Sequence, residues 1–197
     1  MYLKIPNHFI NIIQAWIPIL SLLTLATFSV GLYFALFNSP PDYLQGDSMR
    51  IMYVHVPAAW FALASYSFLS FSCIAWFVFR NPNFNLFAKS IAPIGAVFTI
   101  IALVTGSIWG KPTWGTWWAW DARLTSMLVL FFLYAAYIMT WQAIANKELA
   151  AKISATLGII GFINIPIIKF SVDWWNTLHQ PATISKLSAP SIHISML

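Results

Sequence analysis

Charged residues are scarce in this sequence. Asp, Glu, Lys and Arg make up 8% of its 197 residues, whereas hydrophobic residues make up 60%. A soluble domain usually carries about 25% charged residues, so the composition excludes an ordinary soluble domain and predicts an integral membrane protein. Acidic residues are especially few, and the net charge of +5 comes without any basic run of the kind that binds nucleic acid.

Cysteine is almost absent. The single cysteine, Cys73, lies in an apolar run, which excludes an internal disulfide and a thiolate metal cluster and predicts a small buried hydrophobe. The sequence also lacks a phosphate-cradling loop, a serine or cysteine nucleophile elbow and zinc-ligand spacing. We therefore predict no catalytic residue and no ATP hydrolysis by this chain.

No cleavable signal peptide is expected at the N-terminus. The first apolar run continues to Phe37, which is longer than the roughly 7–15 residues of a signal core, and no small-residue cleavage site follows it. The first membrane span is therefore expected to be retained.

Long apolar runs dominate what is present, and a bilayer-crossing helix needs about 20 such residues. The runs predict an all-α, polytopic membrane helix bundle that forms one unit over residues 1–197. Asn164 and Pro166 are expected to bend the last span. The predicted spans are about 16–37, 54–79, 91–108, 124–144 and 153–170.

Five crossings fix which connecting segments share a side of the membrane. Segments 38–53, 109–123 and 171–197 fall on one side, and the N-terminus with segments 80–90 and 145–152 falls on the other. Lysine and arginine divide five to five between the two sides, so their number alone does not decide the orientation by the positive-inside rule. Their higher density in the shorter loops favours the side of segments 80–90 and 145–152 as cytoplasmic.

The chain is organised around a tryptophan-rich stretch at residues 109–125, which is predicted to be a membrane-surface loop or an interfacial segment. Five of the 11 tryptophans fall within twelve positions there, followed by Asp121 and Arg123. Crowded indoles beside two charges suit a large planar apolar ligand with charged edges. The alternative is an ordinary interfacial aromatic belt, which usually supplies fewer tryptophans per helix end.

Two histidines, His55 and His179, are predicted to share the side of the tryptophan-rich stretch. A histidine at the mouth of a span can simply be hydrogen-bonded at the interface. A pair of imidazoles flanking indoles is instead what a haem pocket requires, because neutral imidazole is a standard axial ligand of haem iron. Arg50 and Arg123 could neutralise the haem propionates. Residue types alone leave both interpretations open.

Residues 114–125, WGTWWAWDARLT, resemble the WWD signature of haem-handling membrane proteins. Two flanking motifs, RIMYVHVPAAW at 50–60 and SVDWWNTLHQ at 171–180, resemble the C protein of the system I cytochrome c maturation pathway, the CcmC family. The system I F protein and the system II synthase share the signature but are much larger. The resemblance extends from about Trp16 to Ala189.

The resemblance implies a protein that binds haem b at the periplasmic face of the bacterial inner membrane. It implies His55 and His179 as the axial ligands of the haem iron. The other implied haem-contacting positions are Arg50, Trp114, Trp117, Trp118, Trp120, Asp121 and Arg123.

The resemblance also implies partners. These are a membrane-anchored periplasmic haem chaperone that receives the haem, an ABC-type ATPase with its membrane subunit, and a small single-span protein. The family normally has a sixth span after the His179 loop, whereas this sequence ends at Leu197 before such a span could form. We expect a five-span arrangement that keeps every ligand candidate.

Two other functions remain open. A cytochrome c haem lyase would form thioether bonds, but the short chain argues against it. A redox subunit would carry electrons through a bis-histidine haem, but such proteins usually hold the haem within the membrane, whereas both histidines here fall at span ends.

Overall fold

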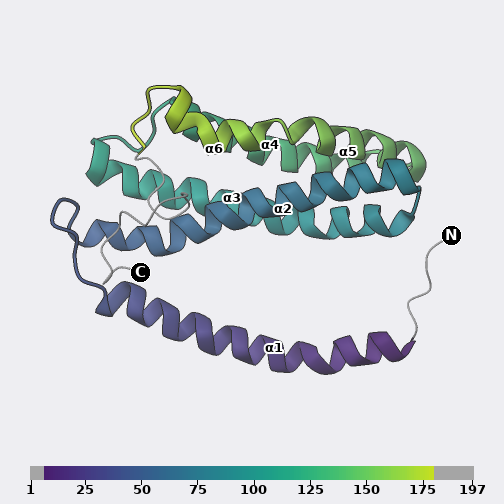
Figure 1. The fold of residues 1–197 in the computed structure, drawn as a ribbon, viewed down its shortest axis with the longest axis horizontal. Helices are drawn as coiled ribbons and strands as arrows, with labels where there is room; N and C mark the ends of the chain where they lie inside the picture. The colour runs from purple at the N-terminus through teal and green to yellow at the C-terminus, as the bar shows by residue number, and fades with distance from the viewer. Residues whose placement is uncertain (1–6, 180–197) are drawn as a thin grey trace.

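The computed structural model describes residues 7–179, which form helices and connecting segments with no β-strand among them (Figure 1). Five helical stretches of the described residues are long and apolar enough to cross a membrane, as predicted. The predicted polar tail to Leu197 lies outside the described residues. The α-helices are α1 (Asn7–Tyr33), α2 (Met52–Phe79), α3 (Pro82–Trp114), α4 (Ala122–Ala143), α5 (Lys147–Gly161) and α6 (Asn164–Trp174).

Helices α2 to α6 pack through small residues and buried tyrosines. Ala62 and Ala92 are fully buried, and such small side chains let membrane helices approach closely. Tyr66 of α2 meets Tyr134 of α4 edge to face, with ring centroids 4.9 Å apart. The Tyr134 hydroxyl donates a 2.8 Å hydrogen bond to the carbonyl oxygen of Ala62. Cys73 is fully buried in this core, as predicted.

Gly95 of α3 provides a test of this packing. A methyl group at position 95 would overlap the Tyr134 hydroxyl, so Gly95→Ala should destabilise the protein by about 1–3 kcal/mol through overpacking. Thermal unfolding in detergent measures the effect. Gly31→Ala is the matched control, because nothing lies within 4 Å of the added methyl group. Equal melting temperatures for the two variants would contradict the packing described here.

Helix α1 stands apart from the other helices (Figure 1). None of its most apolar 18-residue window is buried, and its main contacts are with the short π-helical segment Phe34–Asn38 that continues it. The prediction that all spans pack into one bundle is therefore wrong for α1. An apolar helix that acyl chains surround gains nothing from the hydrophobic effect by packing on another helix, so α1 does not need the other helices to cover its apolar surface.

The connections at one end of the bundle are shorter than predicted, because residues 82–90 and 147–152 are helical. Between α2 and α3, Arg80 adopts a left-handed conformation at φ 54° and ends α2. Asn81 then caps α3 by accepting the amide hydrogen of Asn83 at 3.0 Å. Pro82 follows at the first helical position, where its missing N–H is not needed.

The last crossing is broken as predicted. Helix α5 ends at Gly161 and α6 begins at Asn164. Pro166 has no N–H to bond the carbonyl of Phe162, and that carbonyl accepts the amide of Ile165 instead, at 3.0 Å. The Asn164 side chain donates a 2.8 Å hydrogen bond to the carbonyl oxygen of Ser126 in α4. The break therefore also ties α6 to α4.

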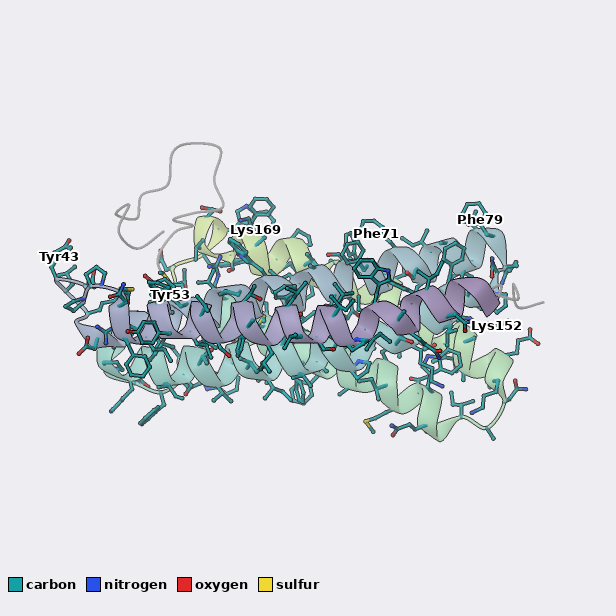
Figure 2. All side chains as sticks on the ribbon, turned by 90° about the horizontal axis from the view of Figure 1, so that it is seen from below. Tyr43, Tyr53, Phe71, Phe79, Lys152 and Lys169 are labelled. Carbon is teal, nitrogen blue, oxygen red and sulfur yellow. The ribbon has the colours of Figure 1, made fainter. Side chains whose placement is uncertain are left out.

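Among residues 7–179, the predicted grouping of the connecting segments is confirmed. The segment after α1, the α3–α4 connection and the end of α6 lie at one end of the molecule, here called the site end (Figure 1). The start of α1 and the α2–α3 and α4–α5 connections lie at the far end. In Figure 2, Tyr43 marks the site end, and Phe79 and Lys152 mark the far end.

Candidate functional site

His55 lies near the start of α2 and packs against one face of α3. Its Nδ1 atom is 3.1 Å from Oγ1 of Thr105. Its ring meets the Trp109 ring edge to face, with centroids 5.8 Å apart. Gly106 lies between these two residues, and a Cβ atom there would come within 3.0 Å of Cε1 of His55. The imidazole therefore fits closely against α3 because residue 106 has no side chain.

His179 is held by Asp121, which ends the tryptophan-rich stretch. Nδ1 of His179 is 3.4 Å from Oδ2 of Asp121, and the Thr177 hydroxyl donates to the same oxygen. The other carboxylate oxygen, Oδ1, accepts the amide hydrogen of Leu124 at 2.8 Å and so caps α4. The Trp114 ring packs on the imidazole, with centroids 4.7 Å apart. The Asp121 carboxylate thus caps the start of α4 and also positions the His179 ring.

These contacts set the charges at Asp121 and His179. Burial raises the pKa of Asp121, but hydrogen bonds from Thr177 and Leu124 and the charge of His179 outweigh it and hold that pKa below its usual value. Burial lowers the pKa of His179, and although Asp121 opposes this, the pKa stays below its usual value. At neutral pH the carboxyl is therefore ionised, and the imidazole is neutral, which is the form that binds metals.

The two histidines lie at the same end, as predicted, and share a charged neighbour. His55 lies near the start of α2, and His179 follows the end of α6 at Trp174. The Arg123 guanidinium acts on both rings. Two imidazoles, one on α2 and one on the segment after α6, are therefore both subject to the charge of Arg123.

The tryptophan-rich stretch differs from its prediction. Its first six residues form the last turns of α3, including Gly110 and Pro112, and the non-helical part begins at Gly115. Gly115 needs its left-handed conformation, φ 78°, to end the helix. The loop alternative is therefore wrong for residues 109–114, because the helix continues into the stretch before glycine stops it.

The indoles of this stretch do not form one flat surface. Trp118 and Trp120 meet at 77° with centroids 5.4 Å apart. Trp120 is 77% exposed and Trp117 is 56% exposed, whereas Trp114 packs on His179 and Trp109 on His55. The crowded indoles of the stretch are therefore divided into two parts. One part contacts the histidines, and the other faces outward.

The two arginines of the predicted site bind chain atoms. Arg50 donates to the carbonyl oxygen of Ser39 at 2.9 Å and pairs with Asp47 at 3.2 Å. Arg123 donates to Ser171 Oγ at 3.2 Å and to the carbonyl oxygens of Ile168 and Lys169. Arg50 therefore joins the segment after α1 to the start of α2, and Arg123 joins α4 to the end of α6.

Two side chains of the site were not predicted, and a third, Trp109, was predicted only as one of the crowded tryptophans of the stretch. Thr105, Thr177 and Trp109 each contact a histidine or its partner. Trp109 is itself held by a 2.8 Å hydrogen bond from Nε1 to Oε1 of Gln45. Thr105 and Trp109 are four residues apart, which places them on one face of a helix. A predicted third helix that extended beyond residue 108 would have shown this.

The fold and this site define a class: a multi-pass helical membrane protein with two histidines, each in contact with a tryptophan, at one end of its helices. Similarity to known proteins agrees with this class. The sequence profile of the family described as Heme exporter protein C, CcmC, matches residues 1–197. The chain belongs to this family.

Three relatives illustrate the similarity. The chain is 44% identical over 192 residues to Heme exporter protein C of Bradyrhizobium diazoefficiens, an alignment that covers 98% of this chain and 73% of the relative. It is 48% identical over 181 residues to the protein of the same name from Escherichia coli K12, covering 92% and 74%. It is 47% identical over 180 residues to that of Haemophilus influenzae, covering 91% and 73%.

Proposed function

We propose that this protein binds haem b between His55 and His179 and presents it at the periplasmic face of the inner membrane for cytochrome c maturation. The observation that carries the proposal is the arrangement of the two imidazoles. Each turns Nδ1 to a partner within the protein, which leaves Nε2 as the nitrogen that can bind iron. Both lie at the same end, beside aromatic rings that suit a porphyrin.

Haem is the cargo in this proposal rather than a catalytic group. The relatives are named haem exporters, and the sequence carries no nucleophile motif. The chain would therefore bind and release haem without making or breaking a covalent bond. The exposed Trp117 and Trp120 would cover a haem face. The propionates would approach the N–H groups of Arg50 and Arg123 that are not used in hydrogen bonds within the protein.

Partners complete the proposed function. A membrane-anchored periplasmic haem chaperone would receive the haem at the site end. An ABC-type ATPase and its membrane subunit would supply energy from ATP hydrolysis, for which this chain carries no motif. A small single-span protein would complete the complex. The site end would face the periplasm, because the density of lysine and arginine in the short far-end connections favours that end as cytoplasmic.

A visible absorption spectrum of protein purified in detergent tests the proposal. Haem bound by two imidazoles gives a low-spin spectrum, and the pyridine haemochrome gives the amount of haem per protein. We expect a low-spin haem that remains bound through gel filtration. Protein that neither carries haem nor takes it up when haem is added would contradict the proposal.

Trp120→Ala separates binding from transfer. Trp120 is mostly exposed and packs on Trp118 rather than on a histidine, so the variant should keep most of its haem. Loading of the purified chaperone should fall several-fold, because the outward indole would meet the incoming partner. Trp60→Ala, another exposed tryptophan, is the control. Chaperone loading at the wild-type rate in Trp120→Ala would argue against a role for the outward indoles.

A further inference from the structure

The two candidate ligands are held by chemically different partners. Nδ1 of His55 faces a neutral hydroxyl, that of Thr105, whereas Nδ1 of His179 faces the carboxylate of Asp121. The partner of the inner nitrogen fixes the tautomer of a metal-binding histidine and tunes how strongly its outer nitrogen donates to the metal. The two imidazoles are therefore not equivalent.

The direction of the hydrogen bond at His55 follows from the contacts of Thr105. The Thr105 hydroxyl donates its single hydrogen to the carbonyl oxygen of Ile101, at 2.6 Å. A hydroxyl has one hydrogen and two lone pairs, so with that hydrogen given to Ile101, Oγ1 acts as an acceptor toward His55. Nδ1 of His55 then carries the hydrogen, and Nε2 carries the lone pair that can bind iron.

The ring is also held in place by packing. Gly106 lets the imidazole approach α3 closely, and the edge of Trp109 limits its rotation on the other side. Thr105 and Trp109 are one helical turn apart on α3. This face therefore fixes both the position of the ring and the identity of the nitrogen that it presents.

The partner of His179 is electrically stronger. The Asp121 side chain is only 7% exposed, and it is fixed by hydrogen bonds from Thr177 and Leu124. A full negative charge in such a setting polarises an imidazole N–H more than a neutral hydroxyl does, even at the longer distance of 3.4 Å.

We infer that Thr105 is a positioning residue for His55, and that its neutral hydroxyl makes His55 the weaker of the two iron ligands and the first to leave. This inference rests on the proposed function. On release, Nε2 of His55 withdraws its lone pair from the iron and an incoming lone pair takes its place. The hydrogen on Nδ1 stays where it is, and no electron is transferred. His179 holds the haem until the exchange is complete.

Carbon monoxide added to the ferrous protein tests which ligand leaves, because it replaces the weaker one. The Fe–C and C–O stretching frequencies, measured by resonance Raman spectroscopy, report the ligand that remains. The wild-type complex should match that of haem-reconstituted His55→Ala, in which His179 is the remaining ligand. A match with His179→Ala instead would overturn the inference.

Thr105→Val tests the positioning role, since it keeps the shape of threonine and removes the hydroxyl. Carbon monoxide should replace His55 about tenfold faster in this variant, the smaller of the effects usual for a lost partner of a metal ligand. Thr105→Ser should restore the wild-type rate. The matched control is Thr99→Val, because Thr99 makes the same bond to the carbonyl four residues earlier on α3, at 2.7 Å.

The outcomes separate this inference from the proposed function. A wild-type protein that binds no haem would defeat the proposed function. Haem that depends on His55 but exchanges equally fast in Thr105→Val and Thr99→Val would defeat only the positioning role. If Thr105→Val does not fold, the inference is tested by Thr105→Ser and by the Raman assignment of the wild-type protein. A Thr105→Ser protein that binds carbon monoxide as fast as His55→Ala would contradict the inference.

Discussion

Replacing both His55 and His179 with alanine should leave the purified protein without haem. Each histidine presents a neutral Nε2 from a different segment of the chain, and no third histidine lies at the site end within residues 7–179. Indoles alone contribute no lone pair to iron. Each single variant should keep a reduced occupancy, because the remaining imidazole still binds iron from one side.

The pyridine haemochrome assay, expressed as haem per protein, measures this loss. His8→Ala is the matched control, because position 8 lies at the start of α1, at the far end, and this variant should keep wild-type occupancy. Gel filtration checks that each variant remains folded. Full haem occupancy in the double variant would show that the two histidines do not bind the iron.

Asp121 variants should have the second largest effect, because one carboxylate carries three contacts. Asp121→Ala removes the cap of α4, which usually costs about 1 kcal/mol of stability. It also removes the acceptor shared by Thr177 and His179. Losing the partner of a metal-binding histidine typically lowers affinity by about 10–100-fold, so haem affinity should fall by that amount.

Asp121→Asn separates the two effects. Asparagine caps a helix as well as aspartate does, so stability should remain near that of the wild type. The negative charge beside His179 is lost, so haem affinity should still fall. Haem titration and thermal unfolding, measured on the same detergent preparations, give both quantities. Unchanged haem affinity in Asp121→Asn would show that the charge of the Asp121 carboxylate does not strengthen haem binding through His179.

The sequence predicted the parts of the fold that depend on apolar length and on parity. Five crossings and the grouping of three connecting segments at one end follow from where hydrophobic runs start and stop. The ends of the helices were predicted less well, because polar residues at 82–90 and 109–114 continue the helix beyond the apolar run. The isolation of α1 could not be predicted, since an apolar helix has the same sequence pattern whether lipid or protein covers it.

The sequence predicted the candidate site residues as a set, through their motifs and the shared side of the two histidines. It did not predict which tryptophans contact the histidines, because the orientation of an indole depends on tertiary packing. Nor did it single out Thr105, whose contact with His55 appears only when α3 and α2 are placed side by side. Local sequence shows composition and the spacing of apolar residues, whereas the contacts of His55 with Thr105 and of His179 with Asp121 join residues 50 or more positions apart.

The central claim is that the imidazoles of His55 and His179 bind one iron from opposite sides. Low-temperature electron paramagnetic resonance of the ferric protein, combined with near-infrared magnetic circular dichroism, reports the two axial ligands directly. The account predicts a single low-spin species with two imidazole ligands, which either single alanine variant converts to a different species. A high-spin wild-type signal, or one that survives the loss of either histidine, would contradict it.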